Sequence, residues 1–116
     1  PLQALTLLND QAYVEMALGF AVSILEKTQG KSDKDRVTHA VRRALSRDPS
    51  AREIKVLLSL LNEQSERLKS DSSIAKSLLS QAPQIEVSKK LDSYEVGAWF
   101  FVANALLNLD ETITKG

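Results

Sequence analysis

The sequence predicts an all-α protein, a single helical bundle of five or six helices. Apolar residues recur every three or four positions along most of the chain, and no run alternates apolar and polar residues as a half-buried strand would. No Asn-Gly or Asp-Gly pair is present to close a hairpin. The chain has 116 residues, 43% of them hydrophobic, which suits one domain with one core. We therefore expect residues 1–116 to form one domain.

Two helices are expected at the start, over about residues 2–8 and 11–29. Asn9 and Asp10 stand between them, where a side-chain oxygen can accept from the free amides of the second helix. The second helix, QAYVEMALGFAVSILEKTQ, is apolar on nearly every face, which predicts a central position. Gly19 in its middle is expected to let another helix approach closely.

Two helices with one buried face each are expected next, over about residues 33–46 and 50–69. Pro49 separates them, because proline disfavours helical angles in the residue before it. Ser50 and Glu53 form the S-x-x-E pattern of a capping box, in which each side chain binds the other residue's backbone N–H. This is the best-defined helix boundary in the sequence.

The last part of the chain is expected to hold a short helix after residues 71–73, a loop over 81–91 and a long final helix. Asp92 or Ser93 should cap the final helix, which carries the consecutive aromatic residues Trp99, Phe100 and Phe101. Successive side chains on a helix point about 100° apart. At least one of the three rings is therefore expected to face a partner or a neighbouring segment.

Composition excludes several classes of site. The chain has no cysteine, which rules out disulfides, thiolate nucleophiles and zinc fingers, and its one histidine rules out multi-histidine metal sites. Lysine plus arginine and aspartate plus glutamate number 15 each, so no global positive field favours nucleic acid. The longest apolar run, residues 12–25, is shorter than the roughly 20 residues of a membrane span. We expect no nucleic-acid partner, no membrane span and no cofactor.

One candidate for chemistry is the polar group Asn108, Asp110 and Glu111, together with Asn9 and Asp10 at the other end of the chain. Such oxygens could bind a hard cation if the two ends met, but the spacing is not that of a calcium loop. Helix capping explains the same residues: Asn9 or Asp10 caps the second helix, and Asn108 caps a short terminal turn with Glu111 at its third position. We therefore predict structural caps, with no catalytic or metal-binding residue.

A second candidate is a basic stripe on the helix over residues 33–46. Arg36, Arg42, Arg43 and Arg47 offer a possible anion or partner surface. The alternative, which we favour, is a solvated face whose arginines pair with nearby carboxylates. Those carboxylates belong to Asp33, Asp35, Asp48 and Glu53.

Three blocks of the chain together resemble one family. They are PLQALTLLND at 1–10 followed by Tyr13-Val14-Glu15, RRALSRDPSAREI at 42–54, and Trp99 with ALLNLDE at 105–111. The pattern resembles the C-terminal part of a planctomycete-specific domain of unknown function, found near the end of large secreted proteins and often beside a c-type cytochrome domain. Residues 45–53 match the family's Leu-x-Arg-x-Pro-Thr/Ser-x-x-Glu turn, whereas Gln11, Asp48 and Thr112 depart from its usual residues.

The resemblance implies a C-terminal fragment of a larger extracytoplasmic protein, periplasmic or secreted, and implies no established reaction. We interpret the chain as a non-catalytic structural or interaction module whose partners are upstream domains of the same polypeptide. One alternative is a part of a redox or polysaccharide-processing enzyme whose active site lies mainly upstream. Another is a module that binds protein or an anionic polysaccharide through the four arginines.

Overall fold

The structure is all-helical, as the sequence predicts. The computed structural model describes residues 11–115, with side chains described for residues 11–109, and this part holds five α-helices and no strand. In chain order they are α2 (Gln11–Lys27), α3 (Asp33–Leu45), α4 (Ala51–Ser70), α5 (Ser72–Ser80) and α6 (Ser93–Lys115). The helix predicted over residues 2–8 lies outside the described residues.

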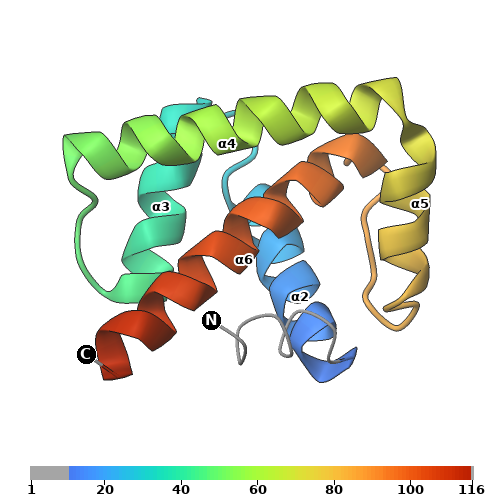
Figure 1. The fold of residues 1–116 in the computed structure, drawn as a ribbon. Coiled ribbons are helices and arrows are strands. Elements are labelled where there is room, and N and C mark those ends of the chain that lie inside the picture. The colour runs from blue at the N-terminus through green and yellow to red at the C-terminus, as the bar shows by residue number, and fades with distance from the viewer. Residues whose placement is uncertain (1–10, 116) are drawn as a thin grey trace.

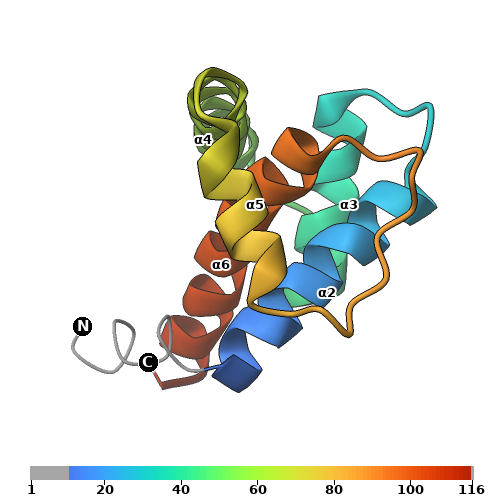
Figure 2. The ribbon, with the colours of Figure 1, turned by 90° about the vertical axis from the view of Figure 1, so that its right-hand side faces the viewer.

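The centre of the bundle is α6. It contacts each of the other four helices, most extensively α4 and α2. Figure 1 shows α4 lying across the upper side of α6, with α3 and α5 on either flank. In Figure 2, α4 and α2 lie on opposite sides of α6. The helix for which the sequence predicts a central position, α2, therefore packs against one side of α6, which is itself the centre.

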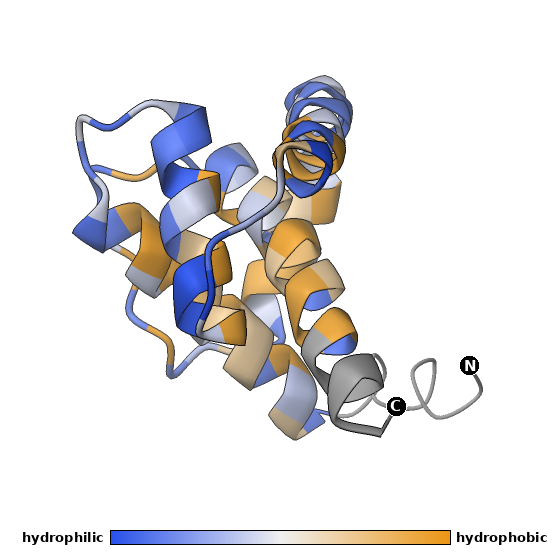
Figure 3. Ribbon diagram, turned by 90° about the vertical axis from the view of Figure 1, so that its left-hand side faces the viewer, coloured by the Kyte–Doolittle hydropathy of each residue, from blue (hydrophilic) through white to orange (hydrophobic). Residues whose placement is uncertain are grey.

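The core is built from apolar side chains of all five helices. The largest fully buried side chain is Trp99 on α6, and α2 alone buries eight residues. By contrast, α3 and α4 each bury one stripe, as their spacing predicts. Figure 3 shows this difference on α4, which is hydrophilic on its outer side and hydrophobic toward the other helices. Within the described residues, no helix has the length and apolar content needed to cross a membrane.

The helix ends follow local chemistry. The Ser32 hydroxyl accepts from the backbone N–H of Asp35 (3.1 Å), and the carboxylate of Asp71 accepts from that of Ser73 (3.1 Å). Gly30, three residues after the end of α2, has a left-handed backbone angle, with φ of 79°. Ser46 adopts φ of 57° after α3, and its N–H donates to the carbonyl of Arg42 (3.0 Å). These caps explain why the predicted helix boundaries agree closely with those observed.

The close approach of two helices occurs at Gly97, not at Gly19 as the sequence suggested. A Cβ atom on Gly97 of α6 would lie 3.0 Å from Cδ1 of Leu68 on α4, which is tighter than ordinary contact. A Cβ atom on Gly19 would lie 3.7 Å from Cδ1 of Ile85, which belongs to the loop between α5 and α6. No other described side chain, and no atom of another described helix, lies within 4 Å of that Cβ position.

The two glycines give a matched prediction. We expect Gly19→Ala to raise the free energy of unfolding by up to about 1 kcal/mol, because alanine is the better helix former and its methyl group fits. We expect Gly97→Ala to lower it, because crowding against Leu68 costs about 1–3 kcal/mol and exceeds the propensity gain. Urea denaturation of both variants measures the difference. A Gly97→Ala protein more stable than Gly19→Ala would contradict this account of the packing.

Candidate functional site

The four arginines of the predicted surface have separate partners. Arg36 on α3 faces the start of α6: its Nη1 lies 3.3 Å from Oε1 of Glu95, and its Nε donates to the backbone carbonyl of Thr28 (3.3 Å). The Arg36 side chain is only 15% exposed. Arg43 points instead toward α2 and donates to the hydroxyl of Ser23 (2.8 Å). These two arginines join helices to one another.

The other two arginines bind the turn between α3 and α4. Nε of Arg42 donates to the carboxylate of Asp48, and Arg47 makes two hydrogen bonds of 2.8 and 2.7 Å to the carboxylate of Glu53. The predicted pairing of the stripe with Asp48 and Glu53 is thus confirmed. The use of the four arginines as an anion or partner surface stays a prediction, and three of them, Arg36, Arg42 and Arg47, each pair with a carboxylate.

Ser50 and Glu53 form the predicted capping box at the start of α4. The Ser50 hydroxyl accepts from the N–H of Glu53 (3.1 Å), and the Glu53 carboxylate accepts from the N–H of Ser50 (2.8 Å). The same carboxylate also binds Arg47. Hydrogen bonds from Arg47 and from the Ser50 backbone lower the pKa of Glu53 from 4.5 to about 2. The turn over residues 45–53 therefore contains a helix cap whose Glu53 carboxylate also forms an ion pair with Arg47.

The structure differs from the prediction for Asn108 in the C-terminal polar group. Asn108 lies inside α6, which continues to Lys115, so the prediction that Asn108 caps a separate terminal turn is wrong. The physical reason is that no proline or glycine follows Asn108 before Gly116, and asparagine alone costs too little to end a well-packed helix. Asn9, Asp10 and the side chains of Asp110 and Glu111 lie outside the described residues.

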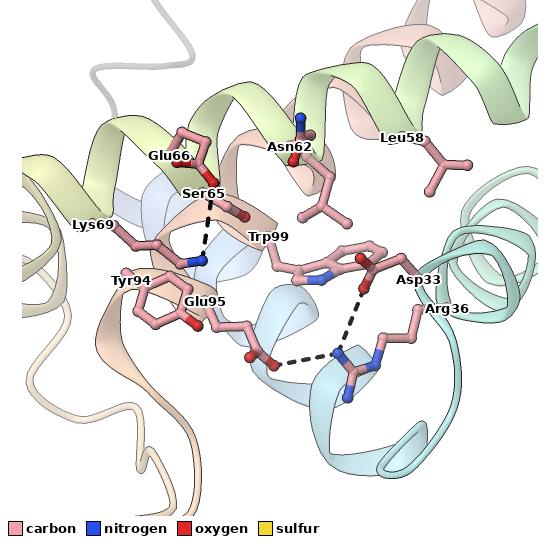
Figure 4. A pocket seen from close by; sticks show the side chains of 11 residues that line it. Asp33, Arg36, Leu58, Asn62, Ser65, Glu66, Lys69, Tyr94, Glu95 and Trp99 are labelled. Atoms are coloured by element: carbon pink, nitrogen blue, oxygen red, sulfur yellow. Dashed lines mark hydrogen bonds and ion pairs between the residues drawn. The ribbon is translucent and has the colours of Figure 1, made fainter.

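A small polar cleft of about 180 Å³ lies where α3 and α4 meet the start of α6 (Figure 4). Its floor is Trp99, which is fully buried and whose Nε1 has no hydrogen-bond partner among the described residues. Figure 4 shows the indole nitrogen on the side of the ring that faces the Arg36–Glu95 pair. Since that nitrogen is enclosed by its neighbours, we interpret the cleft as a polar junction between three helices.

A larger groove of about 600 Å³ lies between α2, α5 and α6. None of the nine described residues that line it is charged. The rings of Phe100 and Phe101 meet edge to face with centroids 5.3 Å apart, and Oδ1 of Asn104 is buried without a hydrogen-bond partner in the described part of the chain. The remaining lining residues are Val14, Ser73, Ile74, Ser77, Leu78 and Gln81.

Phe101 is a groove residue that belongs to the aromatic triplet noted in the sequence. It is half-buried, lines the groove and lies 5.0 Å beneath the Arg67 guanidinium, whereas Trp99 and Phe100 are buried in the core. The expectation that one ring of the triplet faces a neighbouring segment is therefore met by Phe101. The other groove residues carry no motif, and their convergence depends on how α5 folds back against α6.

The described residues do not group three or more of His, Asp or Glu as a metal site requires. The fold and site thus define a small all-α domain with a neutral groove, a polar junction and an ion-paired helix cap.

The model of the family described as protein of unknown function DUF1553, or PSD1, matches residues 1–61. This match covers more than half of the chain, and the chain belongs to that family. No curated protein and no solved structure is significantly similar to the chain. The matched residues include α2, α3 and the capping box, whereas α5 and α6 lie beyond them.

The capping box gives a prediction with a pH dependence. We expect Ser50→Ala to lower the free energy of unfolding by about 1 kcal/mol near neutral pH. We also expect Glu53→Gln to destabilise the protein. The pKa of Glu53 is lowered in the folded state. The contribution of Glu53 to the free energy of unfolding is therefore complete above about pH 4.5 and is lost as the pH falls toward about 2. Urea denaturation across this range should show the Glu53→Gln difference shrinking, and a constant difference would contradict the ion-paired cap.

The arginines give a second prediction. We expect Arg36→Met to lower the free energy of unfolding by about 1–3 kcal/mol, because it leaves Glu95 and the Thr28 carbonyl without their charged donor in a partly buried site. The matched control is Arg42→Met on the same helix. Arg42 and Asp48 are 61% and 73% exposed, so its loss should cost at most about 1 kcal/mol. Equal losses in denaturation experiments would mean that burial does not distinguish the two pairs.

Proposed function

We propose that this chain is a non-catalytic helical module that closes a larger extracytoplasmic protein by packing against an upstream part of the same polypeptide. The observation that carries the proposal is the uncharged groove between α2, α5 and α6. An uncharged groove that contains two aromatic rings is the kind of surface that protein segments fill. The C-terminal placement and the extracytoplasmic location rest on the resemblance in the sequence.

The position of the groove favours an upstream segment of the same chain as its occupant. The side chain of Gln11, the first residue of α2, donates to the backbone carbonyl of Gln81, which lines the groove. The first described residue of the chain therefore lies at the rim of the groove. A segment tethered at that point has a high effective concentration at the groove and needs little intrinsic affinity to occupy it.

The chemistry of the groove defines what suits it. Its rings and aliphatic side chains favour an apolar face, and the buried Oδ1 of Asn104 favours a hydrogen-bond donor within that face. A charged segment would lose its hydration there without gaining an ion pair, since the lining residues carry no charge. We therefore expect an amphipathic upstream segment with apolar side chains toward Phe101.

The absence of cysteine in this chain makes a thiol-protection experiment direct. We expect Ser77→Cys in the groove to react with a maleimide much more slowly in the native full-length protein than in denaturant, because the upstream segment covers it. Ser59→Cys on the exposed side of α4 is the matched control and should react quickly in both states. Peptide mapping by mass spectrometry measures each rate. Equally rapid labelling at both positions in the native protein would refute the proposal.

A further inference from the structure

A third cavity, a pocket separate from the cleft at Trp99 and from the groove, lies between the end of α2 and one face of α3. Its volume is about 360 Å³. Among its lining residues, Lys27, Lys31 and Arg42 carry positive charge and Asp35 carries negative charge, which leaves a net of two positive charges. The other lining residues are Thr28, Thr38 and His39. In a chain with zero formal net charge, this pocket is a local concentration of positive charge.

The connection between α2 and α3 brings these side chains together. Gly30 takes a left-handed angle, with φ of 79°, and the N–H of Lys31 donates to the carbonyl of Thr28 (3.0 Å), so the chain turns back within five residues. This turn holds Lys27 and Lys31 beside α3. On α3, the lining residues 35, 38, 39 and 42 follow helical spacing and therefore share one face. The pocket cannot be predicted from the sequence pattern of one helix, because its lining residues come from α2, the turn after it and α3.

The cationic groups of the pocket keep unused binding capacity. Among the described residues, neither Lys27 nor Lys31 has a carboxylate oxygen within 4.0 Å. Nε of Arg42 donates to Asp48, and its two terminal nitrogens donate no hydrogen bond to any described residue. Nε2 of His39 is buried and also lacks a hydrogen-bond partner there. The hydroxyls of Thr28 and Thr38, by contrast, already donate to backbone carbonyls.

We infer that this pocket binds a tetrahedral oxyanion group, a phosphate or a sulfate. Such a group carries about two negative charges at neutral pH, which matches the net charge of the lining. Ammonium and guanidinium donors make short, charge-assisted hydrogen bonds to its oxygens. A carboxylate group would match only half of that charge. Of the four arginines in the sequence-predicted anion surface, only Arg42 belongs to this pocket.

The test is an NMR titration of the full chain with inorganic phosphate and with inorganic sulfate, at a constant ionic strength set with sodium chloride. We expect saturable shifts at backbone amides of residues 27–42. The double variant Lys27→Gln/Lys31→Gln should weaken binding by at least about tenfold, because it removes two charged donors. The matched control is Lys55→Gln/Lys76→Gln, which makes the same change of net charge at exposed positions on α4 and α5 and should leave binding unchanged.

A third arm replaces the inorganic ion with dextran sulfate, to distinguish a free ion from a polymer as the source of the group. Binding of any of the three ligands that is lost in Lys27→Gln/Lys31→Gln and kept in the control variant supports the pocket. The ligand that binds identifies whether a free ion or a polymer supplies the oxyanion group. Equal weakening in both double variants would mean diffuse attraction, and the absence of saturable binding by all three ligands would overturn the inference. Thermal melts of both variants establish that they are folded. Neither lysine lines the groove, so this result is independent of the thiol-protection experiment.

Discussion

The need to cover α6 on all sides is the constraint on which the rest of the structure depends. This helix buries six fully enclosed residues, Trp99 among them, and every other described helix packs against it. Because α3 and α4 have only one apolar stripe each, they can cover α6 and still present polar faces to water. The short connections then follow: α5 folds back after Asp71, and its loop returns to the start of α6 with Ile85 against Gly19. The groove is the part of this covering that the described helices leave open.

The charged residues divide into those that hold the bundle and those that remain free. Arg36 and Arg47 hold parts of the bundle together. Arg36 donates to the Thr28 carbonyl at the end of α2 and to Glu95 at the start of α6, and Arg47 pairs with Glu53 at the cap of α4. Lys27 and Lys31 have no such commitment within the described residues, although they lie only a few residues from Arg36. Sequence proximity therefore does not separate a structural cation from a cation that is free to bind a ligand. The separation depends on which carboxylates the neighbouring helices bring within reach.

Features encoded within a few neighbouring residues could be predicted, and features built across helices could not. Ser50 and Glu53 specify the start of α4 through contacts three residues apart, and the stripes of α3 and α4 follow from periodicity, so these elements match their predictions. The end of α6 was misjudged because Asn108 has the residue type of a cap, whereas packing of the helix outweighs that local preference. Gly19 contacts Ile85 of the loop and not another helix, and this could not be predicted because the path of residues 81–92 has no local signature. The groove and the basic pocket require three helices and two helices respectively, and no motif marks either.

The central helix is also the last described helix in the chain, and this order affects synthesis. Helix α2 is complete at Lys27, but its main apolar partner is not complete until about 80 residues later, at Leu106. At roughly 5–20 residues per second, a ribosome needs roughly 4 to 16 s to supply the missing surface. During that interval α2 lacks the helix against which it packs most extensively, so its eight core side chains lack their main apolar partner surface. A translation stop before Ser93, where α6 begins, would therefore leave α2 without the helix that it packs against most extensively.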